Sequence, residues 1–359
     1  MIRIIDWYII KKYLGTFAFT MAIFTVVIVI FDVSEKLDDF LKHHAPLSSI
    51  VTQYYAGLIP FYLNMLSPLI NFIAVIFFTA KMADQTEIVP ILSSGVTFNR
   101  FLYPYFISSL VIFLVTLFFN IYVIPRTNRW KVDFENVYIN PNPDNTKRET
   151  HMQLDKNTYV YVESFDNNRK VGYRFTMEKF KGDEMKERLM ADQVAWDSLK
   201  HVWKLSTYTI RKIDGLHEKM SNGAAKDTVL DMRPGDFEAY DNIFQAMTMK
   251  ELNDRMNKEK LRGTGLMVNM ELEKYKRFVY PLSAFVLTLM GVALSSRKVR
   301  GGIGLPLGIG IFLSFAYILS IQFTTMFSLK GGLSPLIAVF IPNILFGALG
   351  TYLIKQAPK

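Results

Sequence analysis

The sequence of 359 residues contains no cysteine. This absence excludes disulfide bonds, thiolate metal sites and cysteine nucleophiles. A folded domain outside the cytoplasm would therefore have to be held together by its own apolar core, without covalent cross-links. The sequence also lacks a Gly-x-x-x-x-Gly-Lys-Ser/Thr motif, which excludes a P-loop nucleotide site in this chain.

Charge is missing from six long stretches. Each has no Asp, Glu, Lys or Arg and is long enough to cross a bilayer, which takes about 20 mostly apolar residues. They are 13–31, 43–80, 101–125, 278–296, 301–329 and 331–354. One small soluble domain could not bury all six, so the sequence predicts a polytopic α-helical membrane protein with six transmembrane helices. The first stretch is expected to stay as a helix, because its apolar part is too long for a cleavable signal peptide and Asp32 follows it.

Basic residues are distributed unevenly between the short loops. With the N-terminus inside, the short outer loops hold Lys36, Lys42 and Lys330, whereas the cytoplasmic pieces hold ten Lys and Arg. The ten are Arg3, Lys11, Lys12, Lys81, Arg100, Arg297, Lys298, Arg300, Lys355 and Lys359. This asymmetry predicts that both termini are cytoplasmic. Topology and attraction to anionic lipid then account for much of the net charge of +9, and no nucleic-acid partner is needed.

A long polar block lies between the third and fourth apolar stretches. Within it, residues 171–178 alternate apolar and polar side chains with a period of two, which is typical of a strand. Turn signals at 181–183 and 221–223 are among those that separate the candidate strands. The block is predicted to hold a periplasmic all-β domain, jelly-roll-like in architecture. Thr248 and Glu251 then form a capping-box pattern that predicts a helix.

The predicted layout is three membrane helices, a β domain and three more membrane helices. The expected boundaries are 1–125 for the first three helices, 126–247 for the β domain, 248–277 for a helical return to the membrane and 278–359 for the last three helices.

Residues 81–100, here called the 81–100 segment, are a polar island between two apolar stretches. Apolar residues recur in it at roughly helical spacing, which predicts a short amphipathic helix at the membrane surface, broken near Pro90 or Gly95. One interpretation is that this helix contacts a cytoplasmic motor protein. The other is an ordinary loop between membrane helices. The candidate contact residues are Asp84, Glu87, Ile88, Ile91, Leu92 and Gly95.

Lys36 and Lys42 follow the first apolar stretch on the predicted outer side, among four acidic residues. They are interpreted either as a solvated surface or as a phosphate contact, since lysine binds phosphate as a point charge. No grouping of nucleophile, base and metal ligands appears in the sequence, and no ionisable residue lies deep in a predicted membrane helix. The chain is therefore expected not to be an enzyme and to hold no metal or cofactor of its own.

Several short motifs occur in an order that resembles the lipopolysaccharide export permeases, the LptF/LptG family. They are the opening 4–10 (IIDWYII), the end of the first helix at 31–40 (FDVSEKLDDF), the cytoplasmic 86–95 (TEIVPILSSG), and MKEL at 249–252 with KYKRFVYP at 274–281. The three-plus-three layout around a β insert covers the whole chain. The end of the first helix is more similar to the LptG branch.

The resemblance implies a permease subunit of an ABC-type exporter in the inner membrane of a Gram-negative bacterium. Such permeases pair with a second permease of the family and with a dimeric cytoplasmic ATPase, which binds the ATP. They take lipopolysaccharide from the membrane and pass it through the periplasmic domain to a periplasmic bridge protein of β-jellyroll type. By the same resemblance, Glu87 and its neighbours would dock into the ATPase, and Lys36 would contact the lipid headgroup.

The resemblance also suggests a role for the predicted strand at 171–178 of the β domain. Period-two alternation would place Val171, Tyr173, Phe175 and Met177 on one face, with Gly172, Arg174, Thr176 and Glu178 on the other. The apolar face is either plain core or, in a jelly roll open along one edge, the path of the lipid. The alternatives for the whole chain are a permease or mechanotransmission subunit for another lipid or a lipoprotein, a membrane-anchored enzyme with a periplasmic β domain, and a structural anchor.

Overall fold

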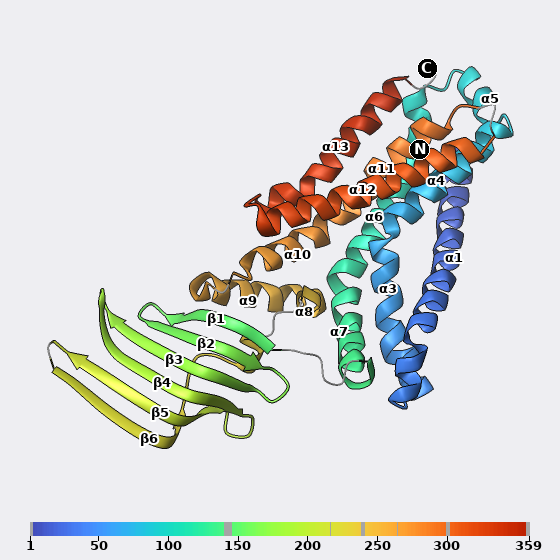
Figure 1. The fold of residues 1–359 in the computed structure, drawn as a ribbon. Helices are drawn as coiled ribbons and strands as arrows, with labels where there is room; N and C mark the ends of the chain where they lie inside the picture. Colours follow the sequence, from blue (N-terminus) through green and yellow to red (C-terminus); the bar gives the residue numbers. More distant parts are fainter. Residues whose placement is uncertain are drawn as a thin grey trace. The chain divides into compact units, whose positions relative to one another are not determined.

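The computed structural model describes residues 3–139, 146–215, 217–237, 241–263, 265–298 and 302–356. The chain divides into two compact units, drawn together in Figure 1. Met1–Ile139 and Glu271–Lys359 form the helical unit, and Asn140–Met270 form the β unit.

The helical unit is built from long apolar helices joined by short turns. Its elements are α1 (Ile4–Lys42), α2 (Leu47–Ser49), η1 (Ile50–Tyr55), α3 (Ala56–Met65), α4 (Ser67–Asp84), α5 (Ile88–Ser93), α6 (Phe98–Phe118), η2 (Phe119–Val123), α7 (Ile124–Phe134), η3 (Glu135–Ile139), η5 (Tyr280–Leu282), α11 (Ser283–Ser295), α12 (Gly304–Lys330) and α13 (Pro335–Gln356). Helix α10 (Met267–Val279) runs from the β unit into the helical unit.

Six helical runs of the described residues are long and apolar enough to cross a membrane, which confirms the predicted six. They are Ile4–Lys42, Ser67–Asp84, Phe98–Ile139, Met267–Ser295, Gly304–Lys330 and Pro335–Gln356. The third run does not stop at 125: α7 and η3 carry it to Ile139. Pro125 lies inside this run, directly after the π-helical turn η2, and its ring cannot donate a backbone hydrogen bond there. The ring of Phe134 is buried against Phe40 and Tyr54, and this packing keeps the polar extension helical.

Helix α4 is the most buried helix of the helical unit, and glycines let its neighbours approach it. A Cβ atom on Gly291 of α11 would collide with Val75, and one on Gly310 of α12 would collide with Ile76. Small residues at helix crossings are the usual means of close packing in membranes. A buried cluster of polar side chains links three helices of this unit. The Tyr13 hydroxyl of α1 lies 2.6 Å from Asn71 Oδ1 of α4 and 2.7 Å from Thr288 Oγ1 of α11.

The β unit is one antiparallel sheet of six strands in the order β1-β2-β3-β4-β5-β6 (Figure 1). The strands are β1 (Thr146–Asp155), β2 (Thr158–Asp166), β3 (Val171–Lys181), β4 (Glu184–Asp197), β5 (Val202–Asp214) and β6 (His217–Thr228). The predicted all-β domain is confirmed, and its connectivity is a meander in which each strand pairs with the next. The turn expected at 221–223 is wrong: these residues lie inside β6, where the missing Cβ of Gly223 leaves room for the ring of Tyr208.

A line of unusual backbone crosses the sheet. Glu149, Arg174 and Thr207, on the alternate strands β1, β3 and β5, have φ angles of 51°, 50° and 50°. The strand register is the same on both sides of this line, which we call the crease, but the opposed residues on the crease itself are left out of the ladders. Side chains alternate between the inner and outer faces on each side of the crease, but the alternation is shifted by one residue across it. In β3, Gly172 is buried on one side of it and Phe175 on the other.

The β unit ends in helices. After the turn η4 (Pro234–Asp236) come α8 (Asp241–Ala246) and α9 (Met249–Arg262), followed by α10. The predicted capping box is confirmed, because Thr248 N donates to Glu251 Oε2 at 2.8 Å and Glu251 N donates to Thr248 Oγ1 at 3.4 Å. Gly263 ends α9 with a φ of 63°, a left-handed conformation that glycine adopts without strain.

Candidate functional site

The 81–100 segment begins at the end of α4, forms the single short helix α5 and ends in the first turn of α6. Pro90 lies in the first turn of α5, so it removes no intrahelical hydrogen bond. Gly95 has a φ of 85° and supplies the left-handed residue of the following turn. Thr97 then caps α6. The predicted short helix is present: Pro90 lies within its first turn without breaking it, and the helix ends before Gly95.

The apolar residues of α5 face their own chain. Ile88 is buried in the core of the helical unit, and Ile91 and Leu92 pack against that core. These three side chains anchor α5 and leave little apolar surface for a partner. The side chain of Val89, which the sequence analysis passed over, is 65% exposed at the tip of α5. Pro90 and Ser93 are exposed beside it.

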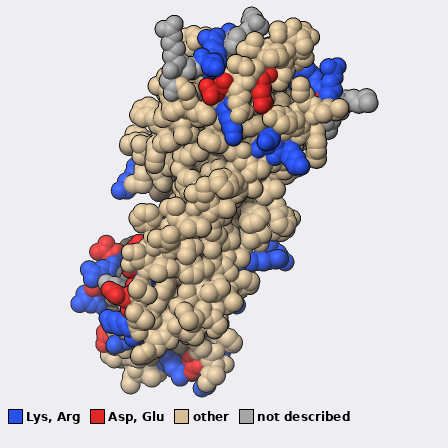
Figure 2. Space-filling model, turned by 90° about the vertical axis from the view of Figure 1, so that its right-hand side faces the viewer, with Lys and Arg blue, Asp and Glu red and all other residues tan. Residues whose placement is uncertain are grey.

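The candidate acidic residues lie at the start of the segment. Asp84 is exposed, and its carbonyl oxygen accepts a hydrogen bond from Lys298 Nζ at 3.1 Å. Glu87 Oε2 accepts a hydrogen bond from the Tyr8 hydroxyl at 3.2 Å. Figure 2 shows charged side chains gathered at the end of the helical unit where α5 and the N-terminus lie, above a band drawn almost entirely in tan. This distribution matches a boundary between water and lipid.

One ion pair at this end joins residues far apart in the sequence. Arg100 Nη1 and Nη2 lie 2.8 and 2.5 Å from the two carboxylate oxygens of Asp6. Asp6 is 1% exposed, and its carboxylate also accepts from the Arg3 N–H at 2.7 Å. The pair was not predicted from the sequence, because nothing local indicates a partner 94 positions away.

The two lysines at the far end of α1 are not brought together. Lys36 Nζ lies 3.0 Å from Glu35 Oε1, and its side chain is 28% exposed. Lys42 is exposed in the last turn of α1. Six residues along a helix correspond to about 9 Å of rise and about 240° of rotation, so the two side chains leave α1 on different sides.

The apolar face of the sheet forms the core of the β unit. Its largest buried side chains are those of Trp203, Phe165, Phe175 and Phe237. Phe175 and Met177 of β3 lie on this face. The expectation that Val171 and Tyr173 share it is wrong: a Cβ atom on Gly172 would meet Val194, Val162 and Phe165 in that core, so Gly172 faces inward and its two neighbours face outward. The crease at Arg174 causes the exchange.

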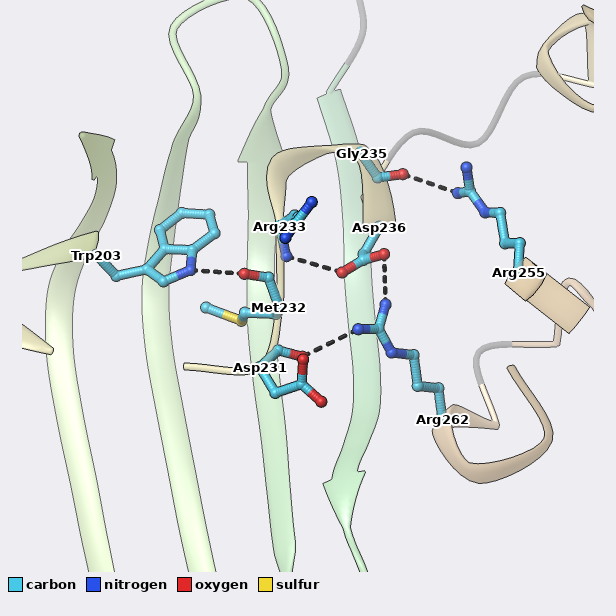
Figure 3. Close-up of polar contacts among 8 residues, drawn as sticks. All are labelled: Trp203, Asp231, Met232, Arg233, Gly235, Asp236, Arg255 and Arg262. Atoms are coloured by element: carbon cyan, nitrogen blue, oxygen red, sulfur yellow. Dashed lines mark hydrogen bonds and ion pairs between the residues drawn. The ribbon is translucent and has the colours of Figure 1, made fainter. Parts of the chain in front are cut away.

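The segment that follows the last strand crosses this face. Residues 230–237, here called the strap, follow β6 and place Met232 and Phe237 in the core of the sheet. The indole Nε1 of Trp203 donates to the carbonyl oxygen of Met232 at 3.0 Å (Figure 3). The signal available in the sequence was the pair Met232 and Phe237 on either side of a polar turn.

Two arginines of α9 hold the strap. Arg262 forms an ion pair with Asp236 and donates to the carbonyl oxygen of Asp231 at 2.9 Å (Figure 3). Arg255 Nη2 donates to the carbonyl oxygen of Gly235 at 2.8 Å. Arg262 is 9% exposed, so its charge depends on these partners for compensation.

Together, these units define a multi-pass helical membrane protein with a β domain inserted between its third and fourth membrane-length helices. The chain matches the family described as lipopolysaccharide export system permease LptF/LptG over residues 7–356, and it belongs to that family. The match covers LptF and LptG alike, so the preference for LptG stays a prediction. No curated protein matches the chain. The chain is thus a multi-pass permease of the inner membrane that belongs to a lipopolysaccharide export system.

Proposed function

We propose that this chain is the permease subunit that takes lipopolysaccharide out of the inner membrane and passes it to a periplasmic bridge protein of β-jellyroll type. A paired permease of the same family completes the membrane part, and a separate dimeric ATPase supplies the energy. Both termini and the 81–100 segment lie in the cytoplasm, and the β unit lies in the periplasm. The observation that carries the proposal is the family match over residues 7–356 of a chain with six membrane-length helices and one β insert.

The ATPase binds at α5. The exposed tip formed by Val89, Pro90 and Ser93 offers a small contact surface, and Asp84 and Glu87 supply negative charge next to it. Ile88, Ile91 and Leu92 support this surface from behind, since they pack on the core of the helical unit. A short helix anchored by its apolar face presents its outer residues at a defined position, which a flexible loop would not do.

The lipid contacts are divided between the two units. Lys36 and Lys42 bind headgroup phosphate at the periplasmic end of α1. The acyl chains travel along the inner face of the sheet at Phe175 and Met177, because exposing each buried CH₂ to water would cost about 0.8 kcal/mol. These side chains are buried in one core with Met232 and Phe237 of the strap, so passage of a lipid requires the strap to move away from the inner face of the sheet.

The direct test is purification of the complex in mild detergent followed by mass spectrometry of its protein and lipid components. We expect a second permease, an ATPase dimer and lipopolysaccharide. Reconstituted into liposomes, the complex should release lipopolysaccharide to an acceptor only when ATP is hydrolysed. A different bound lipid or a lipoprotein would identify another cargo. A complex that purifies without any ATPase would overturn the proposal.

Variants of α5 test the docking surface within the same complex. In this proposal Glu87 pairs with an arginine or lysine of the ATPase. Glu87→Arg should therefore release the ATPase or lower the yield of transport, because losing one member of a desolvated charge pair typically costs about 2–5 kcal/mol. Glu87 also accepts a hydrogen bond from Tyr8, so Tyr8→Phe is the matched control and should retain the ATPase. Val89→Asp should weaken docking without touching that hydrogen bond.

A further inference from the structure

The first turns of α1 contact both ends of the 81–100 segment. Near its start, the Tyr8 hydroxyl lies 3.2 Å from Glu87 Oε2. At its end, Asp6 receives both terminal nitrogens of Arg100, at 2.8 and 2.5 Å. Asp6 and Tyr8 are two residues apart, so a single part of α1 holds the segment on either side of α5.

The Asp6–Arg100 contact is the stronger of the two. The Tyr8–Glu87 hydrogen bond is exposed, whereas the carboxylate of Asp6 is almost completely buried. Two parallel N–H···O bonds fix the guanidinium plane and add directional specificity to the attraction between the charges. The Arg3 N–H occupies a further lone pair of the carboxylate. The pair therefore holds the start of α6 in one orientation relative to α1.

Packing between α1 and α5 is loose in the middle. A cavity of about 30 Å³ lies there, lined on the α1 side by Ile5 and Ile9 and on the other side by Ile91 and Val96. Asp6 and Arg100 close one part of its wall. Because apolar contact across this gap is incomplete, the polar contacts at the ends of the segment add to the apolar packing of Ile88, Ile91 and Leu92 in setting the position of α5 against α1.

We propose that Asp6 and Arg100 are positioning residues that hold α5 against α1, so that a movement imposed on α5 by the ATPase is passed to the first membrane helix. This inference rests on the proposed function, in which the ATPase binds at α5. In this proposal neither residue binds ATP or the lipid, and both act through the position of α5. When the pair is broken, α5 still binds its partner, but its movement is absorbed by the 81–100 segment.

The test measures two quantities in the reconstituted complex: the rate of ATP hydrolysis, and the amount of lipopolysaccharide released per ATP hydrolysed. In Asp6→Asn and Arg100→Gln the ATPase should remain bound and active, while the release per ATP should fall by at least about fivefold, the lower end of typical coupling between sites. Arg100→Lys should be intermediate, because lysine keeps the charge but cannot form the bidentate contact. Lys81→Gln, which removes an exposed cation from the same segment, should behave like the wild type.

A tether separates positioning from a simple loss of folding. The chain has no native cysteine, so a variant with Asp6→Cys and Arg100→Cys can be joined by a short bifunctional thiol reagent. Without the reagent the release per ATP should be low, and after cross-linking it should recover although no charge has returned. Recovery also shows that the variant was folded.

The outcomes are distinct for the two proposals. A wild-type complex that holds no ATPase would overturn the proposed function, and this inference with it. Normal coupling in the wild type together with unchanged release per ATP in Asp6→Asn and Arg100→Gln would overturn the inference alone. So would a tether that fails to raise the release per ATP in a variant that expresses and binds the ATPase normally.

Discussion

The rings of Phe237 and Phe165 stack nearly parallel, with centroids 4.1 Å apart and an interplanar angle of 16°. Phe165 belongs to β2 and Phe237 to the end of the strap, so this stack fixes the strap on the inner face of the sheet. Trp203 completes the arrangement, edge-on to both rings and hydrogen-bonded to the strap backbone.

Phe237→Ala should destabilise the β unit by about 3–5 kcal/mol, the usual cost of removing a buried phenyl ring. Hydrogen exchange measured by mass spectrometry on the full-length protein in detergent would report the loss of protection in β2 and β5. Leu199→Ala is the matched control, since Leu199 is 94% exposed in a turn of the same unit. Equal protection in Phe237→Ala and the control would show that the strap does not stabilise the sheet.

Arg262→Ala should release the strap from α9. Removing one partner of a buried ion pair typically costs about 3–5 kcal/mol, because the other charge is left without compensation. The double variant with Asp236→Ala should cost less than the sum of the two single changes, which a double-mutant cycle would measure as coupling. Lys260→Ala, an exposed change on the same helix, should leave protection of residues 230–237 unaltered. Additive effects of the two single changes would contradict a direct contact.

Thr207→Gly should stabilise the β unit by about 1 kcal/mol. A β-branched residue with a φ of 50° is strained by roughly 1–2 kcal/mol, and glycine relieves that strain while losing part of the gain to chain entropy. Thermal unfolding followed by tryptophan fluorescence would detect the increase. Thr176→Gly, in a strand position without positive φ, should instead lower stability. A destabilised Thr207→Gly would argue against the crease.

Lipid capture should depend on the face of β3. A photo-crosslinking residue at Phe175 or Met177 should capture lipopolysaccharide when ATP is hydrolysed, because both positions lie on the inner face. The same residue at Tyr173 or Thr176 should capture none, since these side chains are directed to the other face. Capture at all four positions would indicate nonspecific adhesion. Capture at none of them in an active complex would show that this strand only forms the core of the β unit and does not contact the lipid.

Topology can be tested with single cysteines in this cysteine-free chain. Ser198, in the turn between β4 and β5, and Ser93 of α5 are both exposed. In intact spheroplasts a membrane-impermeant thiol reagent should label Ser198→Cys and spare Ser93→Cys, because the distribution of basic residues between the loops predicts a cytoplasmic α5. Labelling of Ser93→Cys alone would reverse the orientation.

The sequence predicts best where the signal is local. Long uncharged stretches identify the six membrane-length helices, and the Thr248–Glu251 pattern places the start of α9 within one turn. The extension of the third helix to Ile139 escaped prediction because its residues are polar and become helical by packing Phe134 against distant aromatic rings. A boundary set by tertiary contacts has no marker in the segment itself.

For the candidate sites, too, local signals were predictable and tertiary contacts were not. Periodicity identifies the apolar residues of α5 but cannot say that they face their own chain and leave Val89 outside. The exchange of faces in β3 depends on a positive φ at Arg174, and arginine carries no signal for that conformation. The Asp6–Arg100 pair and the strap both depend on residues that meet only in the folded chain.

The crease makes the sheet of the β unit mechanically anisotropic. The opposed residues are left out of each ladder on one line that crosses all the strands and includes Glu149, Arg174 and Thr207, whereas the other irregularities, near Gln153 and Lys179, each affect a single ladder. Because these pairs are already missing, we expect the sheet to bend about that line more readily than across the continuous parts of the ladders. A force applied to the ends of the strands would then bend the sheet about this line, so that the parts on its two sides rotate relative to each other.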